Sequence, residues 1–254
     1  MNAVFKKELR SYFSSPLAYI LMAIFLCILG FLFINLLSYF SKLSVSALRS
    51  PMYMDRVNAS DSVLRPLFDN FAFLFLIVIP ILTMKSFAEE KRLGSIELLF
   101  TYPLTEFQLI MGKFLAVFIV GGIMVGLTIL FPVILNIFVP QMEWGIVLSG
   151  YIGVFLLLCA FLSLGLWASS LCDNLVIAYM VAFGGSLLFW VLGWLKHLYS
   201  GTLMEFLGNL GFIEHLQNFS KGVIDTADIV FFILFSVFFL FCTYLSLESR
   251  KWKG

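Results

Sequence analysis

Long apolar segments alternate with short charged ones along the chain. Six of the apolar segments are rich in Leu, Ile, Phe and Val, carry no charge near their middles, and are long enough to cross about 30 Å of hydrocarbon as helices. They cover about residues 17–37, 67–84, 114–139, 145–171, 175–195 and 229–247. One central Lys, Arg or Asp would oppose insertion by about 2.5–3.5 kcal/mol. The pattern therefore predicts an all-α polytopic membrane protein, with residues 1–254 forming one transmembrane domain.

Composition agrees with a membrane location. The 254 residues are 61% hydrophobic and include 30 Phe, which leaves too little polar surface to cover a water-soluble globule. The formal net charge of +1 gives no indication of a nucleic-acid partner. No phosphate-binding loop, nucleophile elbow or metal-ligand spacing occurs, so we expect no catalytic residue, metal site or cofactor in this chain. The chain is therefore not expected to be an enzyme.

The distribution of Lys and Arg predicts the orientation. Six spans place both termini on one side of the membrane, together with the 85–113 segment. That side carries ten Lys and Arg residues, and the other side carries six. Because positively charged segments are retained in the cytoplasm, we expect both termini to be cytoplasmic.

The 85–113 segment joins the second and third spans and contains charges of both signs. Ser86 with Glu89 resembles a capping box, which predicts that the second span continues as a helix to about Arg92. Gly94 then allows a sharp turn, because glycine adopts positive φ at little cost. Thr105, with a glutamine three residues later, resembles a second capping box that begins the third span.

Between these helices the sequence predicts a short helix that Ser95 caps and Pro103 stops. Its apolar face, formed by Ile96, Leu99 and Phe100, suits a protein partner. The alternative is a solvated connection whose charges only end the spans.

Two further segments have amphipathic patterns. In the N-terminal segment Phe5, Leu9, Tyr12 and Phe13 share one face and Lys6, Lys7 and Arg10 share another, which suits a helix in the headgroup layer. A soluble amphipathic helix would show the same stripe. Apolar residues between the fifth and sixth spans predict short helices at the outer surface; they include Leu203, Phe206, Leu207, Phe212, Leu216 and Phe219.

Glycines and prolines mark particular places in the spans. Gly121, Gly122 and Gly126 in the third span, and Gly150, Gly153 and Gly165 in the fourth, predict close helix packing, with Gly122 and Gly126 forming a G-x-x-x-G pair. Lining of a substrate path is the alternative. Pro80 and Pro132 are expected to kink their helices.

The run EEKRLGSIELLFTYPLT, Glu89 to Thr105, followed by GKFLA at 112–116, resembles the cytoplasmic bridge of type-2 ABC transporter permeases. In that family the bridge lies between the second and third of six spans and forms a coupling helix that enters a groove on the ATPase subunit. The resemblance implies that charged residues set the register of docking and apolar ones fill the groove. The implied docking residues are Glu89, Glu90, Lys91, Arg92, Gly94, Ile96, Glu97, Leu99, Phe100 and Pro103.

The resemblance extends to both ends of the chain. FKKELRSYFSSPLAYI, residues 5–20, is similar to the family's N-terminal interfacial helix, and FIEHLQNFSKGVIDTADIVFF, residues 212–232, resembles small permeases associated with gliding motility and nitrous-oxide-reductase maturation. This implies an exporter-type permease subunit in a bacterial cytoplasmic membrane. The implied partners are a cytosolic ABC ATPase that binds ATP and Mg²⁺, a second permease subunit in a homodimer or heterodimer, and membrane lipids.

Two other functions fit the same residues. An assembly with the same bridge could use ATP to drive a mechanical or assembly step without moving a solute. A membrane scaffold with no ATPase partner would need the bridge only as a charged stop between spans. The sequence does not indicate the cargo.

Overall fold

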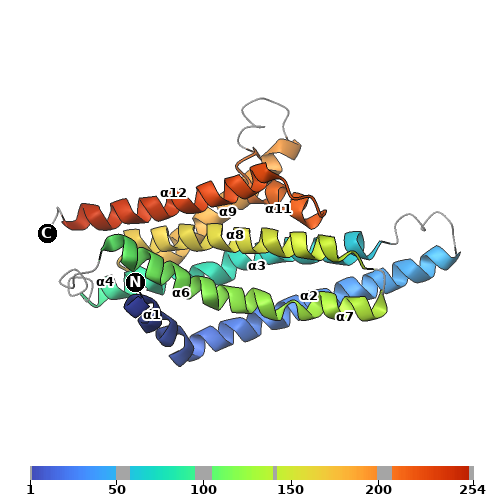
Figure 1. Ribbon diagram of the computed structural model, residues 1–254, viewed down its shortest axis with the longest axis horizontal. Coiled ribbons are helices and arrows are strands. Elements are labelled where there is room, and N and C mark those ends of the chain that lie inside the picture. Colours follow the sequence, from blue (N-terminus) through green and yellow to red (C-terminus); the bar gives the residue numbers. More distant parts are fainter. Residues whose placement is uncertain (1, 50–57, 95–104, 140–141, 199–207, 252–254) are drawn as a thin grey trace.

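The computed structural model describes residues 2–49, 58–94, 105–139, 142–198 and 208–251, and every regular element in these ranges is helical. In chain order these elements are α1 (Asn2–Ser14), α2 (Pro16–Arg49), the π-helical η2 (Ser60–Leu64), α3 (Arg65–Thr83), α4 (Lys85–Arg92), α6 (Glu106–Leu127), α7 (Leu130–Phe138), α8 (Trp144–Leu171), α9 (Leu175–Leu198), α11 (Phe212–Ser220) and α12 (Thr226–Lys251). Figure 1 shows the long helices lying side by side in an elongated bundle.

Six helical segments in the described ranges are long and apolar enough to cross a membrane, as predicted. They are Pro16–Ala47, Ser60–Arg92, Glu106–Phe138, Trp144–Leu171, Leu175–Trp194 and Thr226–Ser249. Helices α1 and α4 lie at the same end of the bundle as the C-terminal part of α12 (Figure 1). We call this the α4 end and the opposite one, which contains α11, the α11 end.

A span differs from its predicted bounds where the helix continues beyond the last apolar residues. The first helix was expected to end near residue 37 but continues to Arg49. Its polar part holds no Gly or Pro, and serine hydroxyls in it donate to the helix's own carbonyls, as Ser44 does to Phe40 O at 2.9 Å. The polar residues therefore end the apolar segment without ending the helix.

Pro132 interrupts the helix of the third span as expected, but the break lies about one turn before the proline. The helix breaks at Thr128 and Ile129, between α6 and α7. Pro132 has no N–H to donate to the carbonyl of Thr128, which instead accepts from Phe131 N at 2.9 Å. The α3 helix continues through Pro80, and α4 follows it after a single turn residue, Met84.

Helices α3 and α8 form the centre of the bundle, and glycines bring α8 close to its neighbours. A Cβ on Gly153 would lie 2.7 Å from Phe219 Cβ, and one on Gly121 would lie 2.9 Å from Leu158 Cδ1. Cβ atoms on Gly150 and Gly165 would lie closer still to Phe68 and Thr83, respectively. The packing role predicted for these glycines is confirmed. At the G-x-x-x-G pair, a Cβ on Gly122 would lie 3.6 Å from Phe155 Cε1, whereas Gly126 has no heavy atom of another element within 4 Å of its Cβ position, so close packing of this pair stays a prediction.

Helix α11 is present as predicted, and its apolar stripe faces the interior of the bundle. Its place at the outer side of the membrane stays a prediction. Phe212, Leu216 and Phe219 are fully buried, and α11 packs against α3, α8 and α9. The Phe212 ring centroid lies 5.1 Å from that of Phe161 and 4.9 Å from that of Phe235. The apolar stripe is therefore part of the protein core. Leu203, Phe206 and Leu207 lie outside the described residues.

Candidate functional site

Helix α4 continues the second span and forms the first part of the charged 85–113 segment. It ends where Leu93 N donates to Glu89 O and Gly94 N donates to Lys91 O. Gly94 has φ of +68°, which confirms the predicted turn, since a side chain is strained in that conformation. The third span begins as predicted: Thr105 Oγ1 accepts from Gln108 N at 3.3 Å.

A buried lysine joins α4 to two other helices. Lys113, in the second turn of α6, has a side chain that is 2% exposed. Its Nζ donates to Glu8 Oε1 of α1 at 2.8 Å and to Ser86 O of α4 at 2.6 Å, and it lies 2.9 Å from Glu90 Oε2. The same Nζ lies 5.1 Å from the centre of the Phe87 ring. One cation therefore ties α1, α4 and α6 together, with two carboxylates balancing its charge.

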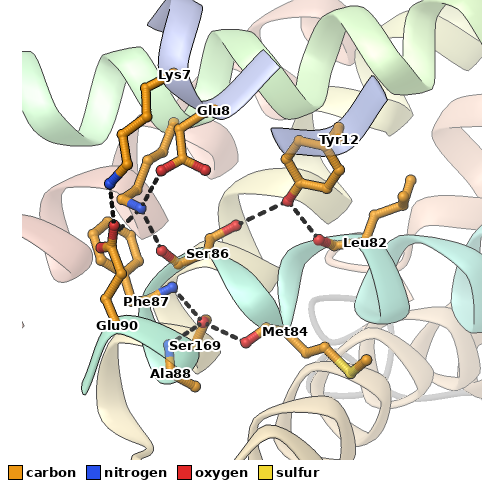
Figure 2. Close-up of polar contacts among 11 residues, drawn as sticks. Lys7, Glu8, Tyr12, Leu82, Met84, Ser86, Phe87, Ala88, Glu90 and Ser169 are labelled. Carbon is orange, nitrogen blue, oxygen red and sulfur yellow. Dashed lines mark hydrogen bonds and ion pairs between the residues drawn. The ribbon is translucent and has the colours of Figure 1, made fainter. Parts of the chain in front are cut away.

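Helix α1 meets α3 and α4 through residues spaced one helical turn apart. Val4, Glu8 and Tyr12 face the protein, and Val4 packs on Gly112 of α6. Tyr12 Oη donates to Leu82 O at 2.8 Å and lies 3.5 Å from Ser86 Oγ, as Figure 2 shows. Burial raises the pKa of the Tyr12 phenol, so it stays a neutral donor at physiological pH.

The predicted apolar face of α1 is divided in two by this packing. Tyr12 is buried inside the protein, whereas Phe5, Leu9 and Phe13 remain half-buried. Lys6, Lys7 and Arg10 are exposed as expected. Lys7 also pairs with Glu90 Oε1 at 3.3 Å (Figure 2). Contact of α1 with the headgroup layer stays a prediction.

A serine of α8 caps α4 from outside its own segment. Ser169 Oγ accepts from Phe87 N at 3.0 Å and from Ala88 N at 3.1 Å, and donates to Met84 O at 3.0 Å (Figure 2). Hydroxyl oxygens commonly satisfy the donors that a helix start leaves unpaired. The predicted cap by Ser86 is wrong: α4 has no side-chain cap of its own. Nothing in the local sequence indicates that Ser169 would take this place.

Lys91 fixes the last turn of α4 to the end of α8. Its side chain is 1% exposed, and its Nζ donates to Ser170 O and lies 3.8 Å from Asp173 Oδ1. Ser246 of α12 donates to the same carbonyl at 3.2 Å. Lys91, which was predicted to lie on a docking surface, holds α4 against the bundle.

The predicted docking residues therefore fall into three groups. Glu90 and Lys91 make contacts within the chain. Glu89 is half-buried, while Arg92 and Gly94 are exposed at the end of α4. Ile96, Glu97, Leu99, Phe100 and Pro103 lie outside the described residues, as does the predicted short helix. In the described part of the chain no cluster of three or more His, Cys, Asp and Glu side chains could hold a metal.

A second polar cluster lies at the α11 end. His215 Nδ1 lies 2.5 Å from Asp228 Oδ1, and Asn218 donates to Asp228 Oδ2 at 2.9 Å. His215 Nε2 lies 2.8 Å from Asn209 O, and since a carbonyl only accepts, this nitrogen carries a hydrogen. The imidazole also stacks on Phe231, with centroids 4.0 Å apart. This histidine joins α11 to α12.

Comparison with protein families identifies one match. The family model described as ABC-2 family transporter protein matches residues 2–219, a range that includes α1, the 85–113 segment and α11. A comparison with curated proteins found no similar sequence.

Proposed function

Because the chain belongs to the ABC-2 family of transporter proteins, we propose that it is the permease subunit of an ATP-driven exporter, with its α4 end in the cytoplasm. Membership of this family makes it a membrane component of an ABC transporter that is not itself catalytic. ATP and Mg²⁺ would bind to a separate cytosolic ATPase subunit. Closure of the ATPase would move the segment after α4 and, through it, the second and third spans.

The observation that carries this proposal is the buried attachment of α4. A slack connection would absorb a displacement without transmitting it. Here Lys113 joins α4 to α1 and α6, while Ser169 and Lys91 join it to α8. A push on α4 would therefore reach α1, α6 and α8 through these contacts and α3 through the chain itself, and α3 and α6 belong to the two spans that the 85–113 segment connects.

Docking to the ATPase would use the outward part of this region. The half-buried Glu89, the exposed Arg92 and the turn at Gly94 lead directly into the 95–103 segment. In that segment Ile96, Leu99 and Phe100 would fill the groove of the ATPase, and Glu97 would fix the register. Glu90 and Lys91 would act indirectly, by fixing the orientation of α4.

A second permease subunit would complete the membrane part. In the single chain, only 17% of the residues in the most apolar part of the fifth span and 22% of those in the sixth are buried, compared with 72% in the second span. The fifth and sixth spans therefore leave large faces for lipid and for another subunit. Whether the partner is a second copy or a related chain decides between a homodimer and a heterodimer.

Replacement of Gly94 tests the coupling. Gly94→Ala adds one methyl group with open space around it, so its only effect is backbone strain of about 1–2 kcal/mol at positive φ. We expect reduced stimulation of ATPase activity in the reconstituted complex, with membrane insertion unchanged. Gly222→Ala is the control for backbone strain, because Gly222 also has positive φ, +82°, but lies near the α11 end; its added methyl group would in addition lie 3.0 Å from Ile146 Cγ1. Equal ATPase stimulation by both variants and the wild type would contradict the proposal.

Two further measurements separate the alternatives. Loss of a co-purifying nucleotide-binding protein on deletion of residues 94–103 would exclude the scaffold without an ATPase. Uptake of solute into inverted vesicles during ATP hydrolysis would exclude a purely mechanical module. Tight ATPase coupling without movement of any tested solute would instead favour that module.

A further inference from the structure

A cavity of about 480 Å³ lies at the α4 end, between α1, the end of α3 and α4. Its size falls in the range of small-molecule sites. The lining residues come from α1, the start of α2, the end of α3, α4 and, through Lys113, α6. The cavity therefore sits directly beside the contacts that hold α1 against α4.

The lining is apolar beside the ends of the first two apolar spans and charged beside α4. Leu17 and Ala18 begin the first span, and Ile81 and Leu82 stand in the last turn of the apolar part of the second. Lys85 and Glu89 follow on α4, and Ser11 and Ser14 lie opposite them on α1. A ligand that fits this lining has an apolar part at hydrocarbon depth and a polar part at headgroup depth.

The charges of the lining cancel, and most of them are already paired. Three lysines face three glutamates. Lys7, Glu8, Glu90 and Lys113 form the ion pairs described above. Lys85 and Glu89 are half-buried and form no ion pair with another described residue. The cavity therefore offers one cation and one carboxylate to a ligand, and no excess of either sign.

We propose that this cavity binds the headgroup of a phospholipid that carries both a phosphate and a primary ammonium, namely phosphatidylethanolamine. Lys85 and the hydroxyls of Ser11 and Ser14 would bind the phosphate, and Glu89 would accept hydrogen bonds from the ammonium. The acyl chains would leave over Leu17 and Ile81 into the bilayer.

Two related headgroups fit less well. An anionic glycerol headgroup would bring a negative charge that Glu89 repels, without an ammonium to offset it. A choline headgroup has no N–H to donate to a carboxylate, and so loses the contact that Glu89 offers. The bound lipid would brace α1 against α4. This inference depends only on the chain spanning a membrane. If it holds, Glu89 contacts the lipid, and docking to an ATPase depends on Arg92, Gly94 and the 95–103 segment.

Lipid retention tests the proposal. The full-length protein is purified from membranes, placed in nanodiscs with equal amounts of phosphatidylethanolamine, phosphatidylcholine and phosphatidylglycerol, exchanged into detergent, and its retained lipids counted by native mass spectrometry. We expect phosphatidylethanolamine to exceed each of the others by roughly two- to tenfold, the scale of two partly exposed ionic contacts. Equal retention of all three lipids, or preference for phosphatidylglycerol, would overturn the proposal.

Variants of the lining residues test whether the lipid binds in this cavity. The double variant Lys85→Gln with Glu89→Gln removes both ligand charges, and Ser11→Trp fills the polar half from an exposed position. Both are expected to abolish the preference. Lys221→Gln with Asp225→Asn is the matched control, because it removes an exposed cation and anion near the α11 end and should leave the preference unchanged. An undiminished preference in both cavity variants would contradict the site.

Discussion

The two ends of the bundle are held together by different kinds of contact. At the α4 end, Lys113, Lys91 and Ser169 join the helices through hydrogen bonds and ion pairs. At the α11 end, aromatic rings fill the space between α8, α9, α11 and α12, with Phe212 at their centre. The His215 to Asp228 pair is the counterpart of the lysine cluster, but it joins only two helices.

This difference has a mechanical consequence. Hydrogen bonds to a buried charge depend on direction and distance, so they hold neighbouring helices in one relative position. Burial of apolar surface depends mainly on area and is non-directional. We therefore expect the helices of the α4 end to move together, and the aromatic contacts of the α11 end to allow more relative movement of the helices. A region that passes on a displacement needs the first kind of contact.

Loss of the lysine charge is expected to have the largest effect. Lys113→Met keeps most of the side-chain volume but leaves Glu8 and Glu90 without their buried cation, which should lower the free energy of unfolding by about 3–5 kcal/mol. Chemical denaturation in mixed micelles measures this. Adding Glu8→Gln and Glu90→Gln to the same chain should recover most of the loss, because no unpaired buried charge then remains. No recovery in the triple variant would show that volume, and not charge, matters here.

The aromatic end should respond to volume instead. Phe212→Ala is expected to cost about 3–5 kcal/mol of unfolding free energy, while Phe212→Leu, which keeps much of the volume, should cost less than about 1.5 kcal/mol. The same denaturation series compares the two. If Leu were as damaging as Ala, the aromatic cluster would be as specific in geometry as the lysine cluster, and the contrast between the ends would fail.

Close packing between α8 and α11 should give an intermediate effect. Gly153→Ala places a methyl group 2.7 Å from Phe219 Cβ, which lies next to the backbone and has little room to move. We expect a loss of about 1–3 kcal/mol in unfolding free energy. Gly126→Ala is the control, because that position is open; there the stability should stay unchanged or rise by up to about 1 kcal/mol. Similar losses at both positions would argue against a tight α8–α11 contact.

The smallest effect is expected for a single neutral hydrogen bond at the α4 end. Tyr12→Phe removes the donor to Leu82 O and should cost about 0.5–1.5 kcal/mol at neutral pH. Because burial raises the pKa of Tyr12, the folded protein keeps this proton above pH of about 10, where the unfolded chain releases it. Wild-type stability should therefore fall above that pH, and the gap between the two proteins should narrow. A gap that stays constant up to pH of about 11 would contradict burial of the phenol.

Local sequence predicted the features that depend on local chemistry. The bounds of the fourth span agree within one residue, because its ends coincide with changes from apolar to polar residues. The turn at Gly94 and the cap at Thr105 were predicted for the same reason, since each is decided by neighbouring residues. The extension of α2 to Arg49 was missed because hydropathy marks the membrane and does not mark the helix end.

The candidate site was predicted in part. The sequence pointed to the charged residues of α4 and assigned Glu89, Glu90, Lys91 and Arg92, but not Lys85, to an external partner. Glu90 and Lys91 instead face inward, toward Lys113 and Ser170. Glu8 and Lys113 lie 105 positions apart in the chain, and no pattern within either segment indicates that they meet. Val4, Glu8 and Tyr12 are spaced four residues apart and so share one face of a helix, which was the one available signal. This spacing does not indicate which other segment packs against that face.

The sequence by itself determined that this chain crosses a membrane six times and where charge gathers between the crossings. Insertion depends on the sum of local transfer free energies, which each segment carries with it. Only the tertiary structure decided which of those charges are internal. A buried ion pair exists only where distant helices bring both partners together and exclude water, and that depends on how the whole bundle packs.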